Sequence, residues 1–218
     1  MKKLIFRDDN FDAILALNGN LPEISFFESI NSTLIAADGA ANNLLSINII
    51  PDFIIGDLDS FDKNYKLNKT KIIQIDDQDT NDFEKCLIWC SKNNKHKILI
   101  IGFHGGELEH SINNISVFKK YAQKLELTIL DNDRYGIFVD QSFYSNFNSN
   151  EIISIIPLPS ALLRTKGLVW ELDNTLLELG IKEGARNRTK IDFVEINIIS
   201  GQFLLFFDSH YPKIPLLI

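Results

Sequence analysis

The strongest constraint on the fold is an alternation of short apolar runs with helical patterns, which continues to about residue 133 and then stops. Strands that alternate with helices predict βαβ units, and therefore a mostly parallel sheet with helices on both faces. The strands expected in this part are residues 13–17, 33–37, 53–55, 72–75, 97–101 and 126–130, and the helices are residues 22–30, 40–47, 80–93 and 107–124.

Beyond residue 133 the helical period fades, and short apolar runs are separated by Asn, Ser, Gly and Pro. Residues 192–198 alternate polar and apolar side chains, as a half-buried antiparallel strand does. The sequence therefore predicts two domains, an α/β domain over 1–133 and an all-β sandwich over 134–218. The strands expected in the second domain are residues 137–139, 151–156, 168–172, 191–199 and 203–207, with a polar loop over 141–150.

Charge and composition exclude several classes of function. With 22 Lys and Arg against 29 Asp and Glu, the formal charge is −7, which argues against a non-specific nucleic-acid binder. No apolar run approaches the ~20 residues that span a bilayer, and charge at Arg7 interrupts the N-terminus too early for a signal peptide. We therefore expect a cytoplasmic protein without a nucleic-acid or membrane partner. Cys86 and Cys90 are too few for a disulfide framework or a four-cysteine zinc site, and are expected to be buried and inert.

Acidic residues follow three of the expected strands, at the edge of the sheet where ligands of open α/β folds bind. Asp38 follows the second strand, Asp57 and Asp59 follow the third, and residues 76–79 follow the fourth. Two carboxylates two residues apart project to the same side of an extended chain, and they repel unless a cation or a proton intervenes. Carboxylate oxygens suit Mg²⁺ and its phosphate ligands. The alternative is a set of ordinary turns and helix caps, Asp79 being an example of a cap.

A glycine pair, Gly105-Gly106, lies between an expected strand and an expected helix. Its amides could form a nest for phosphate oxygens, or the pair could simply make a turn. Glu107 and Glu109 come directly afterwards and would repel a phosphate. Trp170, on the expected strand 168–172, is either a core residue or a platform that stacks on an aromatic ligand.

Taken together, these motifs closely resemble the thiamine pyrophosphokinase (thiamine diphosphokinase) family. The matching segments occur in the order in which the family has them, over roughly residues 35 to 190: residues 37–42, 51–60 and 78–87, then Gly105-Gly106, residues 165–170, and Arg186-Asn187. The resemblance implies an ATP-binding α/β domain and a C-terminal β-sandwich that binds thiamine and dimerises. It also implies a homodimer with the thiamine site between subunits. The implied reaction transfers the pyrophosphoryl group of ATP to the hydroxyl of thiamine and releases AMP.

Carried onto this sequence, the resemblance implies that Asp57, Asp59 and Asp82 are the catalytic carboxylates and hold Mg²⁺. Asp38 and Gly39 lie close by, and Trp170 of the partner subunit stacks on thiamine. The other residues implied to contact ATP or thiamine are Gln78, Asn81, Lys85, Gly105, Gly106, Thr165, Arg186 and Asn187.

This chain departs from the family pattern at several positions. Glu107 stands where members carry a basic residue, Glu109 where they carry Asp, Asn81 where Thr is usual, and Arg186 where Ser is usual. One hypothesis is that Arg186 or Arg188 supplies the missing positive charge, because guanidinium groups bind phosphate in bidentate fashion.

Two other functions fit part of the pattern. A non-catalytic relative that binds thiamine or a nucleotide would not require all of Asp57, Asp59 and Asp82. A metal-dependent phosphohydrolase would have no use for Trp170, and would release phosphate rather than AMP.

Overall fold

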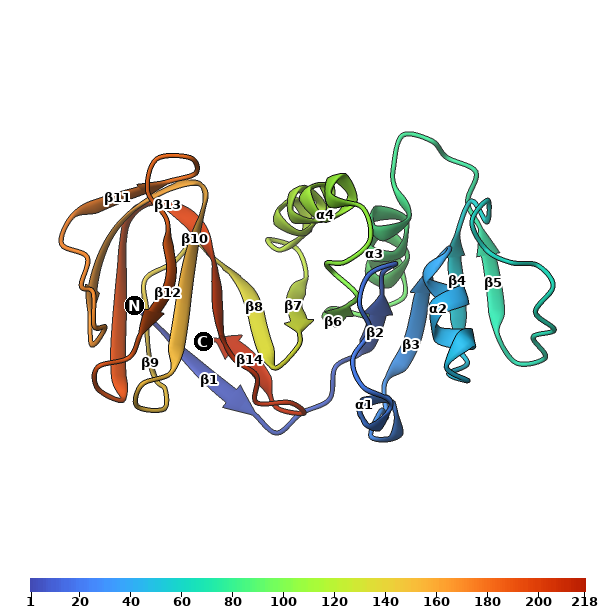
Figure 1. Cartoon of the computed structure of the whole chain (residues 1–218), viewed down its shortest axis with the longest axis horizontal. Coiled ribbons are helices and arrows are strands. Elements are labelled where there is room, and N and C mark those ends of the chain that lie inside the picture. The colour runs from blue at the N-terminus through green and yellow to red at the C-terminus, as the bar shows by residue number, and fades with distance from the viewer. The chain divides into compact units, whose positions relative to one another are not determined.

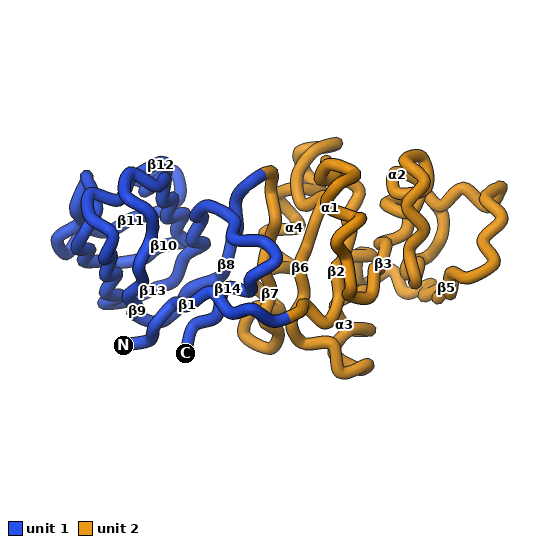
Figure 2. The backbone as a smooth tube through the Cα atoms, turned by 90° about the horizontal axis from the view of Figure 1, so that it is seen from below, with its two compact units in different colours: residues 1–9, 133–218 blue, residues 10–132 orange.

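The protein, described here over residues 1–218 by a computed structural model, divides into two compact units (Figure 2). One unit comprises residues 10–132 and the other comprises residues 1–9 together with 133–218. The expected boundary differs at the N-terminus, because β1 (Lys2–Arg7) pairs antiparallel with β14 (Ile214–Leu217) and parallel with β9 (Phe143–Asn146). Residues 1–9 of the chain therefore belong to the all-β unit.

The unit of residues 10–132 is built on a six-stranded parallel sheet in the order β7-β6-β2-β3-β4-β5 (Figure 1). Buried Ile, Leu and Ala fill the central strands, as parallel sheets require. The strands are β2 (Ala13–Ala16), β3 (Thr33–Ala37), β4 (Phe53–Gly56), β5 (Lys71–Gln74), β6 (Lys97–Ile101) and β7 (Glu126–Asp131). The helices are α1 (Ile24–Glu28), α2 (Ala40–Ser46), α3 (Asp82–Lys92) and α4 (Leu108–Tyr121).

Each expected helix and strand of this half is present, with ends that differ by a few residues, and the predicted α/β fold class is confirmed. Cys86 and Cys90 are buried on α3, as predicted, and burial raises the pKa of both thiols, that of Cys90 to about 12. None of the helices combines the length and apolar character that a bilayer crossing requires.

The second unit contains only strands, and the predicted all-β class is confirmed. Two long antiparallel strands, β10 (Ile152–Lys166) and β13 (Phe193–Asp208), form its centre. The expected strands 191–199 and 203–207 are thus one strand, whose pairing register shifts beside Gly201. A Cβ at Gly201 would lie 2.1 Å from the Ser160 carbonyl oxygen, so this irregularity requires glycine. The remaining strands are β8 (Arg134–Val139), β11 (Thr175–Glu178) and β12 (Gly184–Arg188).

Two expectations for this half are wrong. The polar stretch 141–150 is not wholly a loop, because Phe143 and Ser145 are buried on β9. The expected strand 168–172 is a loop, in which only Leu168 forms a bridge, to Thr189.

A buried carboxylate joins α3 to α4. Glu84 on α3 accepts hydrogen bonds from the Lys120 ammonium and, at 2.8 Å, from the Tyr121 hydroxyl. Burial raises the pKa of Glu84, but the bonds from Lys120 and Tyr121 outweigh it and leave the pKa below the ordinary value of 4.5.

We therefore expect Glu84→Gln to lower the free energy of unfolding by about 1 kcal/mol at pH 7, because the Lys120 ammonium and the Tyr121 hydroxyl lose a charged acceptor. The folded-state pKa is depressed, so the advantage of the wild type is present above pH 4.5 and disappears as the pH falls through the folded value. Urea unfolding at pH 7 and pH 3.5 measures this. The exposed Glu28→Gln is the matched control, and an equal loss at both pH values would contradict the prediction.

Candidate active site

Three carboxylates converge where two neighbouring strands end. Asp38 follows β3, and Asp57 and Asp59 follow β4. Because β3 and β4 are parallel neighbours, with Ala37 opposite Ile55, the segments that leave them meet at one edge. One oxygen of each carboxylate lies within 4.8 Å of the others. We call these three residues the carboxylate cluster.

Asp38 is the buried member of the cluster. Its side-chain Oδ2 accepts a hydrogen bond from the Ser60 amide at 3.1 Å, whereas its Oδ1 is buried without a hydrogen-bond partner. Burial raises the pKa of Asp38, and the nearby carboxylates of Asp82 and Asp59 add to the rise, against the Ser60 amide. Buried polar atoms are normally paired, and a buried carboxylate oxygen beside two further carboxylates is a fitting ligand for a divalent cation. The residues present therefore fit Mg²⁺.

Lys85, on α3, ties Asp57 to Asp82. Its ammonium lies 3.3 Å from Asp57 Oδ2 and 3.0 Å from Asp82 Oδ1, and its side chain is 2% exposed. Burial lowers the pKa of Lys85, but the two carboxylates outweigh burial and raise it above its ordinary value. Gln78 also donates to Asp57 Oδ2, at 3.3 Å. For Asp57, burial raises the pKa, and hydrogen bonds from the Asp59 amide, Lys85 and Gln78 lower it overall.

Asp82 stands beside the cluster rather than within the closest group. A Cβ placed on Gly56 would lie 2.7 Å from the Asp38 Cβ and 2.9 Å from the Asp82 Oδ1, so these two carboxylates flank the end of β4. Asn81 accepts a hydrogen bond from the Glu84 amide at 2.9 Å and thereby caps α3. This cap fixes the first turn of α3, from which Asp82 projects.

A pocket of about 430 Å³ adjoins the cluster, at the point where the strand order of the sheet reverses. From β2 the chain moves outward through β3, β4 and β5, and then returns to place β6 on the other side of β2. Such reversals create a crevice between diverging loops, where α/β proteins bind ligands. Of the predicted residues, the pocket is lined by Asp38, Gly39, Asn81, Asp82, Gly105 and Gly106.

Sequence reasoning did not identify the other wall of this pocket. Asn18 and Gly19, directly after β2, line it, as do His110 and Asn114 of α4. The signal available was the change from apolar to polar residues where the first expected strand ends. Glu107 also lines the pocket, and its carboxylate lies 3.2 Å from His110 Nε2.

The predicted thiamine residues lie in the all-β unit, around one loop. The Asn187 amide group brackets Trp170, accepting from its amide at 3.1 Å and donating to its carbonyl at 2.7 Å. Thr165 donates to Glu171 at 2.7 Å, and Glu171, which sequence reasoning missed, accepts from the amide of Gly167. The Trp170 side chain is 61% exposed, so it is not a core residue.

The two arginines of the hypothesis differ in the hydrogen bonds that they make. Arg188 donates to Asn150 Oδ1 at 3.1 Å, whereas the exposed Arg186 is held by its backbone, whose amide donates to Ser154 Oγ at 3.0 Å. Arg186 has a φ of +58°, which directs the chain away from a regular strand.

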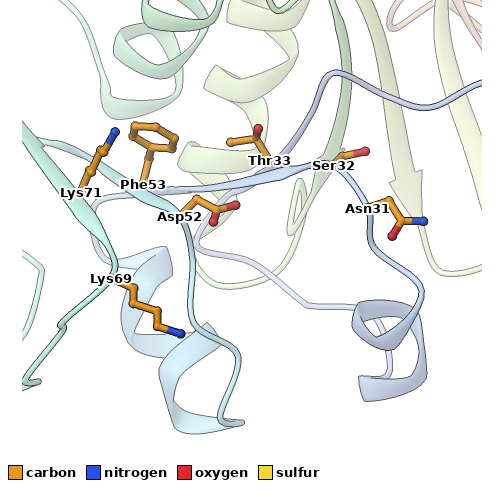
Figure 3. A pocket seen from close by; sticks show the side chains of 7 residues that line it. All are labelled: Asn31, Ser32, Thr33, Asp52, Phe53, Lys69 and Lys71. Carbon is orange, nitrogen blue, oxygen red and sulfur yellow. The ribbon is translucent and has the colours of Figure 1, made fainter.

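A second pocket, of about 370 Å³, lies at the amino-terminal ends of β3, β4 and β5 (Figure 3). The ammonium groups of Lys69 and Lys71 point apart there, and Asp52 Oδ2 accepts from the Leu34 amide at 2.9 Å. None of the predicted site residues lines it. We therefore place the candidate active site at the carboxylate cluster.

Comparison with known proteins finds relatives of this chain. Residues 27–129 match the family model described as the thiamin pyrophosphokinase catalytic domain. A thiamine pyrophosphokinase of Oryza sativa is 27% identical over 77% of this chain and 76% of its own length. That of Saccharomyces cerevisiae is 33% identical over 81% of this chain and 54% of its own length. The crystal structure of a yeast thiamin pyrophosphokinase superposes on this chain with a TM-score of 0.78 at 19% identity. The superposition covers 93% of this chain and 87% of that one.

The fold and the site define a two-unit protein: an α/β unit with a carboxylate cluster at the carboxyl ends of its parallel strands, and an all-β unit. The chain belongs to the thiamine pyrophosphokinase family.

The shared ammonium of Lys85 yields a stability prediction. Lys85→Met keeps the volume of the side chain but leaves Asp57 and Asp82 without their cation, so we expect a loss of about 1–3 kcal/mol in unfolding free energy. Thermal unfolding measures the loss. Lys92→Met, an exposed substitution at the end of the same helix, is the control and should change little. Equal melting of both variants would contradict the assigned role of Lys85.

Proposed function

We propose that this protein is a thiamine diphosphokinase, which transfers the pyrophosphoryl group of ATP to the hydroxyl of thiamine and releases AMP. The observation that carries the proposal is the carboxylate cluster beside the pocket at the strand-order reversal, in a chain of this family. Pyrophosphoryl transfer requires positioning and charge neutralisation more than covalent chemistry by the protein.

The proposed metal is Mg²⁺, with Asp57 and Asp59 as its principal ligands and Asp82 as the third catalytic carboxylate. Asp38 joins this set, because its buried Oδ1 has no other partner. When bound, a divalent ion neutralises phosphate charge and orients the triphosphate. Lys85 and Gln78 fix the Asp57 carboxylate through hydrogen bonds to its Oδ2, so that the ligand set is held before substrate arrives.

The proposed ATP site is the pocket beside the cluster. Gly105 and Gly106 place backbone amides there without side chains, ahead of the N-terminus of α4. No Lys or Arg lines this pocket. Of the two arginines in the hypothesis, we propose Arg186 as the residue that contacts a substrate, because its side chain is exposed and Arg188 is engaged with Asn150.

The proposed thiamine site includes Trp170, Thr165 and Asn187, and lies between the subunits of a homodimer. Trp170 supports this, because its ring is exposed and its backbone is fixed on both sides by the Asn187 amide group. Large apolar side chains exposed in the same unit support an interface there; they include Val169, Leu176, Leu179 and Ile181. The nucleotide-binding role of the α/β unit, the thiamine-binding role of the β unit and a cytoplasmic location complete the proposal.

The direct test is incubation with ATP, Mg²⁺ and thiamine, followed by chromatography. Formation of AMP and thiamine diphosphate in equal amounts supports the proposal. Release of phosphate that does not depend on thiamine would indicate a phosphohydrolase. Binding of thiamine or ATP with no product at all would indicate a non-catalytic relative.

Asp57→Asn and Asp59→Asn should each reduce kcat by at least ~10²-fold, because each removes charge that stabilises the transition state. Steady-state kinetics at saturating ATP and thiamine measures this. Asp76→Asn, an exposed carboxylate outside the cluster, is the control. Near-normal turnover in both cluster variants would exclude these residues from the metal site.

Trp170→Ala should raise the KM for thiamine about two- to tenfold, because aromatic stacking is worth about 0.5–1.5 kcal/mol beyond area burial. The KM for ATP should stay unchanged, as should the melting temperature, since the ring is exposed. Trp170→Phe should recover most of the affinity. An unaltered thiamine KM in the alanine variant would remove Trp170 from the site.

A further inference from the structure

Two loops that meet at the strand-order reversal are interlocked through their backbones. The loops comprise residues 17–20, after β2, and residues 102–106, after β6; we call them the paired loops. The Asn20 amide donates to the His104 carbonyl at 2.8 Å. A Cβ on Gly19 would lie 2.1 Å from the same carbonyl oxygen, so the close approach requires glycine. A shift of one loop therefore displaces the other.

The side chain of His104 fastens this pair of loops to the sheet. Its Nδ1 lies 2.7 Å from Asp131 Oδ1, and its Nε2 lies 3.4 Å from the side-chain Nδ2 of Asn20. One neutral tautomer satisfies both contacts, with Nδ1–H donating to Asp131 and Nε2 accepting from Asn20. Asp131 is the last residue of β7, which pairs with β6, so the anchor belongs to the rigid sheet.

The paired loops form one wall of the pocket, but His104 itself does not. Asn18, Gly19, Gly102, Gly105 and Gly106 line the pocket, and most of them have no side chain with which to hold their own position. Glycine-rich segments lose the most conformational freedom on ordering. A fixed side chain next to them lowers that cost before a ligand binds.

We propose that His104, held between Asp131 and Asn20, is a positioning residue that preorders the paired loops for the nucleotide. The inference rests on the proposed function in one respect, that the ligand of this pocket is ATP. Loss of the imidazole leaves the carboxylate cluster intact, so it weakens nucleotide binding without slowing the chemical step.

The test is binding of a non-hydrolysable ATP analogue with Mg²⁺ by calorimetry, together with steady-state kinetics. His104→Ala should raise the Kd of the analogue and the KM for ATP about five- to tenfold, which corresponds to the net value of one hydrogen bond. The kcat at saturating ATP should change less than about twofold, which a damaged catalytic centre would not allow.

His104→Asn provides the rescue, because its Nδ2 takes the place of the imidazole Nδ1 and can still donate to Asp131. It should bind within about twofold of the wild type. Asp131→Ala should match His104→Ala, and the double variant should lose nothing further, because the two residues act through one contact. His96→Ala, at the opposite end of β6, is the control and should bind normally.

Unchanged analogue binding in His104→Ala would overturn the inference, as would a fall in kcat at constant Kd, or a His104→Asn variant as weak as alanine. If His104→Ala fails to fold, Asp131→Ala decides, since it removes the acceptor of the His104 Nδ1–H and leaves the imidazole in place; binding equal to the wild type would overturn the inference. If the wild-type protein does not bind the analogue, that result contradicts the proposed function itself. A wild type that binds, with binding unchanged in the variants, removes only the role of His104.

Discussion

Electrostatic repulsion among carboxylates is the constraint on which the site depends. Asp38, Asp57, Asp59 and Asp82 gather around the ends of two strands, and one buried ammonium, that of Lys85, is shared by two of them. The arrangement divides the acids into two kinds. Asp57 is held ionised by its hydrogen bonds, whereas burial raises the pKa of Asp38 and leaves one of its oxygens without a partner. The excess negative charge in the folded protein creates the demand for a cation.

The topology of the sheet explains why these residues and the pocket lie together. Parallel strands bring all their carboxyl ends to one edge, and the return of the chain to β6 opens a crevice at that edge. Helix α3 then supplies Asp82 and Lys85 from its first turn, which Asn81 caps. The same edge therefore holds carboxylates on one side and glycine backbone on the other, an arrangement that suits a metal-bound polyphosphate.

Much of this could be predicted from local pattern. Buried apolar runs located the parallel strands, and the spacing of Asp57 and Asp59 indicated a shared cation. What could not be predicted depends on partners distant in sequence. Nothing near Lys2–Arg7 reveals that its partner strand is Ile214–Leu217, and nothing near His104 points to Asp131. The apolar neighbours of Trp170 predict a strand, but Glu171 accepts a hydrogen bond from the Gly167 amide and holds the segment as a loop.

The placement of β1 has a consequence for biosynthesis. The ribosome makes this strand before the α/β unit, yet its neighbours Phe143–Asn146 and Ile214–Leu217 follow that unit in the sequence. The α/β unit, encoded in one uninterrupted stretch, has all its strands available well before then. Nascent β1 consequently remains an unpaired strand until these two partners have been made, and that interval is when a chaperone has reason to shield it.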